Sequence, residues 1–166
     1  MTGVHRLDLL ASLLDGQPRS VAAATRTRDT HGREDMAAAV LEFEADILAT
    51  VRFAMDAPHG GDGLVVHGTR GSIRATGTTT QWWGGGGGEV VLTSAAGTHA
   101  TQYDGIDLYE RQVEAFLALL RGEETTVADA ADGAAAVAVA SAIRESARTR
   151  RHVSVPPTEI QRREAT

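Results

Sequence analysis

A strict alternation of side chains between Val40 and Asp56 constrains the fold more than any other feature of the sequence. Successive side chains of a β-strand point to opposite faces, so a period of two predicts strands. A turn at Ala45-Asp46 divides the segment into a hairpin. The second face carries residues such as Thr50 and Arg52 rather than a row of charges, which predicts that both faces are covered. The inward face is predicted to hold Leu41, Phe43, Ile47, Ala49, Val51, Phe53 and Met55.

The segments on either side of this hairpin add a helix and further strands. Gly3 to Asp15 has leucines at helical spacing and ends in Asp15-Gly16 before Pro18, which predicts a helix. Ser20 to Thr30 alternates small or apolar with polar residues and predicts a half-buried strand. Glycine-containing turns predict two more hairpins, LVVH with SIRA and EVVLTS with THATQY.

The last third of the chain changes from strands to helices. Asp107 and Glu110 form an acidic variant of the capping box, and Gly122 closes the predicted helix. An alanine-rich helix is predicted to begin at Asp132, and HVSVPP predicts a short final strand. The first of these helices carries an apolar stripe of Tyr109, Val113, Phe116, Leu117 and Leu120.

This order of elements defines the expected fold class. A run of strands followed by a run of helices indicates an α+β fold, with an open, predominantly antiparallel sheet and helices packed on one face. We expect one domain over residues 1–156 and a flexible tail over residues 157–166.

Composition excludes several kinds of partner and chemistry. The 166 residues have a formal net charge of −6, which argues against nucleic acid and anionic membranes. All 16 basic residues other than histidine are arginine, so the chain supplies no lysine base, and the absence of cysteine excludes thiolate metal sites. No apolar run approaches a membrane span or a signal sequence, and the expected location is the cytoplasm.

Two other patterns fall short of a ligand site. The run QWWGGGGGEV leads into a strand rather than a helix, so it predicts a hairpin connection and not a phosphate loop. Its Trp82 and Trp83 could line a ligand surface, but alternation favours one core-facing and one exposed residue. The six histidines lack HxH or HxxxH spacing, so no metal site is expected.

His5 and Asp8 are the best candidates for catalytic residues. Three positions apart on a helix, they share one face and can touch. An imidazole beside a carboxylate is a common acid–base device. The alternative is a capping or packing contact, which is the commoner role of a lone His–Asp pair on an amphipathic helix.

Five segments in the same order resemble the C-terminal domain of the glucose–fructose oxidoreductase/inositol dehydrogenase (Gfo/Idh/MocA) family. Residues 3–10 (GVHRLDLL) are similar to its D-x-G-x-H-x-x-D-L helix, and residues 64–73 (LVVHGTRGSI) to its G-[ST]-x-G-x-[IL] hairpin. Gly16-Gln17-Pro18 with SVAA resembles its passage from helix to strand, and residues 109–120 and 132–155 resemble its closing helices and strand.

The resemblance implies a division of labour. In the family, a preceding Rossmann domain binds NAD(H) or NADP(H), while this second domain shapes the sugar or polyol site and builds the oligomer. The resemblance gives His5 the handling of the substrate hydroxyl proton and makes Asp8 its orienting neighbour. Met1 stands where the family has an aspartate, and the family's catalytic lysine is missing. The resemblance thus implies an N-terminally truncated domain that begins inside the catalytic helix and binds neither cofactor nor metal by itself.

Three functions stay open at this level. The first is a split NAD(P)-dependent dehydrogenase for sugar or cyclitol CH–OH groups. In it, this chain is the substrate-binding and oligomerisation half, inactive alone, and a separate Rossmann polypeptide holds the cofactor. The second is a non-catalytic dimerisation or sugar-binding module, and the third is a truncated gene remnant. A homo-oligomer that forms through a sheet face is expected because both faces of the sheet are poor in charge.

Overall fold

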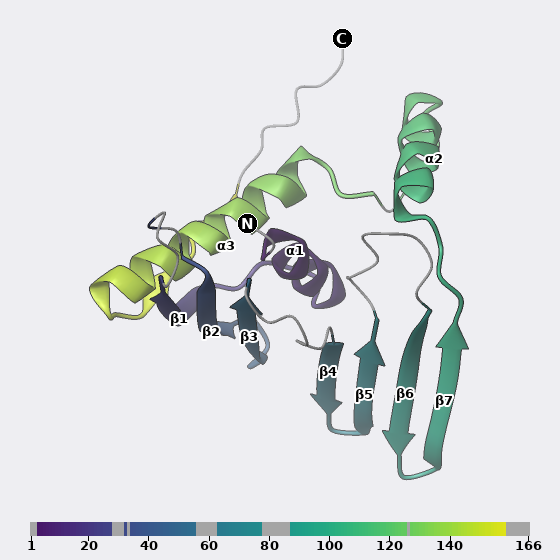
Figure 1. The fold of residues 1–166 in the computed structure, drawn as a ribbon, viewed down its shortest axis with the longest axis horizontal. Coiled ribbons are helices and arrows are strands. Elements are labelled where there is room, and N and C mark those ends of the chain that lie inside the picture. The colour runs from purple at the N-terminus through teal and green to yellow at the C-terminus, as the bar shows by residue number, and fades with distance from the viewer. Residues whose placement is uncertain are drawn as a thin grey trace. The chain divides into compact units, whose positions relative to one another are not determined.

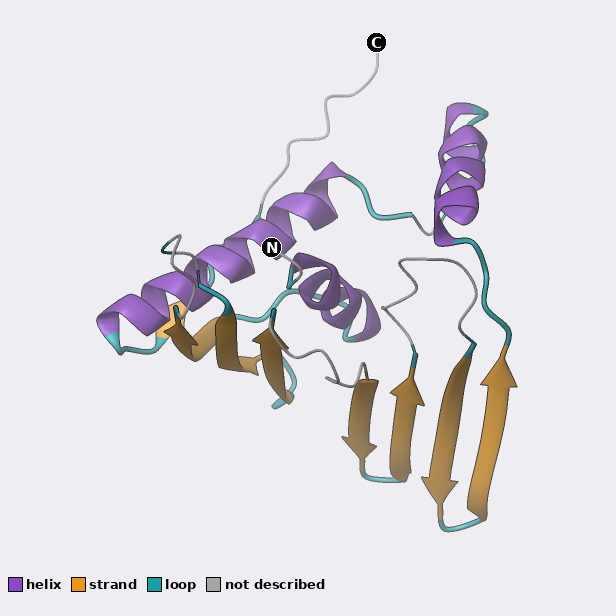
Figure 2. Cartoon of the chain, viewed as in Figure 1, coloured by secondary structure: helices purple, strands orange, loops and turns teal. Residues whose placement is uncertain are grey.

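The computed structural model describes residues 3–27, 32, 34–55, 63–77, 87–125 and 127–158. The chain forms two compact units, one from residues 1–58 and 128–166 and the other from residues 59–127. In the described part, each unit contains one four-stranded antiparallel sheet (Figure 1 and Figure 2). The α+β class is confirmed. The alternation of side chains did not predict that the strands form two separate sheets instead of one.

The first sheet has the order β3-β2-β1-β8. Strand β1 pairs with β2 along its whole length, and β2 pairs with β3 in the same way. The predicted hairpin is confirmed, with Ala45 and Asp46 at positive φ in the turn. Strand β8 pairs with only Ser20 and Val21, so the rest of the β1 edge has no strand partner among the described residues. The strands are β1 (Ser20–Arg26), β2 (Met36–Glu42), β3 (Leu48–Ala54) and β8 (Val153–Ser154).

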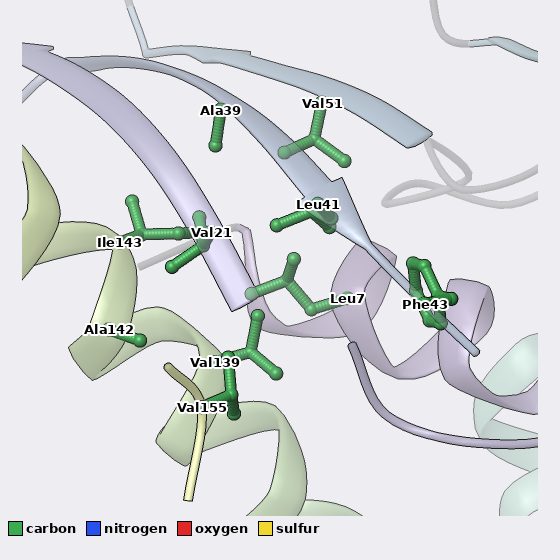
Figure 3. Close-up of a cluster of buried hydrophobic side chains, with 10 residues drawn as sticks. All are labelled: Leu7, Val21, Ala39, Leu41, Phe43, Val51, Val139, Ala142, Ile143 and Val155. Carbon is green, nitrogen blue, oxygen red and sulfur yellow. The ribbon is translucent and has the colours of Figure 1, made fainter. Parts of the chain in front are cut away.

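Helices α1 (Val4–Leu13) and α3 (Ala130–Thr149) pack on one face of this sheet and bury its core (Figure 1). The inward face of the predicted hairpin is confirmed at its centre, but Ile47 and Met55 are exposed because they lie beyond the ends of β3. Figure 3 shows the buried cluster, which consists of Leu7, Val21, Ala39, Leu41, Phe43, Val51, Val139, Ala142, Ile143 and Val155.

Helix α3 begins at Ala130, two residues before the predicted start. The side chain of Asp129 accepts hydrogen bonds from the backbone N–H groups of Ala131 (2.7 Å) and Asp132 (3.1 Å). In return, the Asp132 carboxylate accepts from the Asp129 N–H at 2.8 Å. This reciprocal capping box places Asp132 at the third position of the helix rather than the first.

The other face of the first sheet is open within its unit. Cross-strand neighbours at its centre are small or uncharged apart from Arg52, and Arg26 and Glu42 lie towards its ends. No described helix or strand of this unit covers this face, so its coverage stays a prediction. We define the outer face as the exposed residues Ala22, Ala24, Ala38, Val40, Thr50 and Arg52.

The second unit contains a meander in the order β4-β5-β6-β7, which confirms both predicted glycine-turn hairpins. Its register places Val66 opposite Ile73 and Ile73 opposite Leu92, so one face is apolar across β4 to β6, whereas β7 adds His99 to it. Trp82, Trp83 and most of the glycine run lie outside the described residues. The strands are β4 (Gly63–Gly68), β5 (Gly71–Thr76), β6 (Gly88–Ser94) and β7 (Gly97–Tyr103).

Helix α2 (Leu108–Leu120) belongs to the second unit and begins as predicted. The Asp107 side chain accepts from the N–H groups of Tyr109 (2.9 Å) and Glu110 (3.1 Å). Gly122 follows the helix with φ of 76°, as a helix-closing glycine does. The predicted apolar stripe lies on this helix with its side chains exposed. The predicted tail lies outside the described residues from position 159 onward.

Candidate functional site

The predicted pair, His5 and Asp8, lies on helix α1. Leu7 anchors this helix in the core with only 4% of its surface exposed, whereas His5 is exposed and Asp8 is half-buried. The start of the helix approaches β3 closely, because a Cβ on Gly3 would lie 3.3 Å from the ring of Phe53. A fixed helix thus carries an imidazole that is accessible to solvent.

His5 and Asp8 lie about one turn apart on α1. Residues three apart share a face, yet no hydrogen bond or ion pair joins these two side chains in the described structure. The orienting role of Asp8 therefore stays a prediction. An accessible imidazole can exchange a proton with a bound hydroxyl, but no side chain in the described part of the chain fixes its orientation.

The electrostatic features of the described residues lie elsewhere. No group of three His, Asp or Glu side chains among them could hold a metal ion. On α3, the hydrogen bond from Arg148 to Glu145 (2.7 Å) lowers the pKa of Glu145 and raises the pKa of Arg148. None of the described helices is long and apolar enough to cross a membrane.

A cleft of about 380 Å³ lies where β1 passes the C-terminal end of α3. At its base, the buried Ser146 hydroxyl accepts from the Ala23 N–H (2.9 Å) and donates to the Arg151 carbonyl (2.6 Å). We call this the β1-edge cleft; its charged or titratable lining residues are Arg26, Arg150, Arg151 and His152. The sequence prediction missed it, and the run Arg150-Arg151-His152 after a helix is the one local signal that pointed to it.

Comparison with known protein families gives a match over residues 1–155. The matching model is described as the C-terminal alpha/beta domain of an oxidoreductase family, Gfo/Idh/MocA. The match includes all the helices and strands described above. Comparison with curated proteins gives no match.

Solved structures share the fold at low sequence identity. An aldose–aldose oxidoreductase from Caulobacter crescentus, complexed with glycerol, has a TM-score of 0.76 at 20% identity, over 92% of this chain and 45% of its own. An oxidoreductase from Agrobacterium radiobacter, in complex with NAD+, L-tartaric acid and magnesium, has a TM-score of 0.72 at 21% identity. The match covers 92% of this chain and 47% of the oxidoreductase. The WlbA dehydrogenase from Bordetella pertussis, in complex with NADH and UDP-GlcNAcA, has a TM-score of 0.68 at 21% identity. The match covers 93% of this chain and 43% of the dehydrogenase.

The chain therefore spans less than half the length of these relatives. The shared fold accounts for the α+β architecture, and the family match confirms the resemblance seen in the sequence. Together these findings show that the chain belongs to the Gfo/Idh/MocA oxidoreductase family and corresponds to its C-terminal α/β domain.

Proposed function

We propose that this chain is the substrate-binding and oligomerisation half of an NAD(P)-dependent oxidoreductase for sugar or polyol hydroxyl groups. The family match over residues 1–155 carries the proposal. Two of the relatives described above are complexed with NADH or NAD+, together with UDP-GlcNAcA or L-tartaric acid, and the third is complexed with glycerol. These last three compounds all carry hydroxyl groups on carbon, the group that such an enzyme oxidises.

The residues of this chain do not fit a dinucleotide site. Pyrophosphate binding requires a G-x-G-x-x-G turn that follows a strand and opens a helix. The glycine run at 84–88 instead leads into β6, whose first residue is Gly88, so it opens a strand and not a helix. We therefore assign the cofactor to a Rossmann domain outside this sequence.

We assign His5 to proton exchange with the substrate hydroxyl and Asp8 to orienting His5. The exposure of His5 on an anchored helix supports this role, because the imidazole is open to a molecule bound beside α1. Hydrogen bonds between catalytic groups are often incomplete before substrate binds. We expect the His5–Asp8 contact to form in the complex with substrate and the Rossmann domain.

We assign oligomerisation to the outer face of the first sheet. A shallow hollow of about 360 Å³ runs over this face, and its lining includes Ala22, Ala38 and Val40. Small side chains let a second surface approach the backbone closely, and exposed apolar sheet faces commonly serve as protein interfaces. A second copy of the chain, bound symmetrically, is the partner that we expect.

The test is reconstitution with a Rossmann polypeptide encoded directly upstream. Both purified chains are assayed, separately and together, for NAD+ and NADP+ reduction with a panel of aldoses and polyols. We expect turnover only in the mixture, and no binding of NADH or NADPH to this chain alone in calorimetric titration. Saturable one-to-one cofactor binding by this chain alone would overturn the assignment of the cofactor to a separate Rossmann domain. A stable complex without turnover would instead support the non-catalytic module.

A further inference from the structure

The β1-edge cleft exists because the last strand is short. Strand β8 pairs with only Ser20 and Val21, so β1 runs on from Ala22 without a strand partner on that side in the described structure. The C-terminal end of α3 lies beside this free edge (Figure 1). The polypeptide then turns at Arg150, which has φ of 56°, and returns through Arg151 and His152 to β8.

Positive charge is concentrated around this cleft in a chain whose net charge is −6. Arg26, Arg150 and Arg151 line it, and none of the three forms an ion pair with a described carboxylate. His152 has Glu42 at 3.7 Å, so the arginines supply the uncompensated charge. By contrast, five other arginines are paired: Arg19 with Glu44, Arg111 with Glu114, Arg121 with Glu123, Arg144 with Glu34 and Arg148 with Glu145.

Helix-end electrostatics explains only part of this cluster. A cation after the last turn of α3 is stabilised by the carbonyl groups that end the helix, which accounts for one of Arg150 and Arg151. It does not account for Arg26, which comes from β1 and lines the same cleft. Three like charges at one place are held more favourably when an anion lies among them.

The base of the cleft is rigid and already hydrogen-bonded. Ser146 is 1% exposed and uses its hydroxyl for both the Ala23 N–H and the Arg151 carbonyl. A peptide that added a strand to the β1 edge would need the Ala23 N–H, which already donates to Ser146. Beyond Ala23, only three residues of β1 remain for such a peptide to pair with. A cleft of about 380 Å³ instead has the size of a small-molecule site.

We propose that the β1-edge cleft binds the phosphoryl group of a small ligand, held by Arg26, Arg150 and Arg151. The guanidinium group is planar and presents parallel N–H donors that match phosphate oxygens, and three of them balance a dianion with charge to spare. A site for an anion on an acidic protein requires this kind of local clustering, because the overall field of the protein repels anions. The proposal does not depend on the catalytic role given to His5.

The test is titration of the full chain with inorganic phosphate at constant ionic strength, followed by backbone amide NMR shifts. We expect saturable shifts at residues 22–26 and 146–152, with a Kd of about 1 mM or lower. The double variant Arg150→Gln/Arg151→Gln should bind at least about tenfold more weakly, and so should Arg26→Gln, which leaves the helix end untouched. Arg144→Gln on the same helix is the matched control, and its affinity should equal that of the wild type. Thermal midpoints verify that each variant is folded.

Sulfate and acetate distinguish a dianion site from general anion attraction. Sulfate should compete with phosphate and acetate should not, because acetate has a single charge. Equal loss of affinity in Arg144→Gln and in the cleft variants would overturn the proposal, as would shifts that do not saturate. Binding of an acidic extended peptide to β1, without saturable phosphate binding, would also overturn it and indicate strand addition instead.

Discussion

At the scale of single residues, one hydroxyl joins three segments of the first unit. Ser146 on α3 accepts from the Ala23 N–H of β1 and donates to the Arg151 carbonyl in the turn before β8. Because Ser146 is 1% exposed, water cannot easily replace these bonds. We expect Ser146→Ala to lower the free energy of unfolding by about 1–3 kcal/mol in urea denaturation, since two backbone groups lose their partner.

Ser141→Ala is the matched control for this substitution. Ser141 lies on the same helix and is exposed, so its replacement should change the free energy of unfolding by less than about 0.5 kcal/mol. If both alanine variants unfolded at the same urea concentration, Ser146 would have no special role at the β1 edge.

A second residue-scale prediction concerns the pair Glu145 and Arg148. The hydrogen bond from Arg148 lowers the pKa of Glu145, whose usual value is 4.5. A carboxyl pKa that is lowered in the folded state contributes stability above the unfolded pKa, and that stability is lost as pH falls through the folded pKa. In Arg148→Gln, the pKa of Glu145, measured by carboxyl NMR titration, should rise toward 4.5. An unchanged pKa would mean that the pair does not persist in solution.

At the scale of elements, local sequence patterns predicted individual helices and hairpins. They did not predict how the strands pair into sheets. The leucines of α1 and the alternation around Ala45-Asp46 are features of adjacent residues, so the helix and the hairpin could be predicted. The start of α3 was misplaced because Asp129 and Asp132 both have the chemistry of a cap. Alternation assigns side chains to faces but does not determine which strands pair, so the division into two sheets could not be predicted.

The same reasoning explains what could be predicted of the candidate sites. His5 and Asp8 were recognisable because they are three residues apart on one helix, although no hydrogen bond joins them in the described structure. The β1-edge cleft was missed because Arg26 and Arg150 come from opposite ends of the chain. The packing of α3 beside β1, a tertiary feature, brings these two arginines to one cleft.

The cap of α3 gives a prediction at this scale. Asp129→Ala removes the acceptor for two N–H groups at the start of the helix, and we expect a loss of about 0.5–2 kcal/mol in the stability of the first unit. Hydrogen exchange at Val21, in the core of that unit, reports this loss. The control is Asp107→Ala, which removes the cap of α2 in the second unit. Equal acceleration of exchange at Val21 by both variants would contradict separate stabilisation of the two units.

At the scale of the whole molecule, the outer face should determine the oligomeric state. Ala38 lies on this face directly opposite Arg52, so Ala38→Arg places two like charges side by side in the proposed interface. We expect the wild type to sediment as a dimer or larger oligomer and Ala38→Arg to sediment as a monomer. Ala95→Arg makes the same change in an exposed turn of the second unit and should leave association intact. A wild-type monomer at high concentration would contradict this interface.

We propose that α1 brings a proton-transfer residue, His5, to an active site shared with a Rossmann domain. A positioned imidazole accelerates proton transfer by about 10²–10⁴-fold. His5 is exposed and has no hydrogen bond or ion pair in the described structure, so His5→Ala should cost roughly 0.5 kcal/mol or less in stability. Asp8→Asn should lower turnover by a smaller factor, because Asp8 only orients His5.

The most direct test is therefore turnover of the reconstituted enzyme with wild-type chain, His5→Ala and Asp8→Asn, with thermal midpoints measured on the same samples. We expect His5→Ala to lose about 10²–10⁴-fold in turnover while its thermal midpoint stays close to that of the wild type. Equal turnover in the wild type and His5→Ala would contradict it.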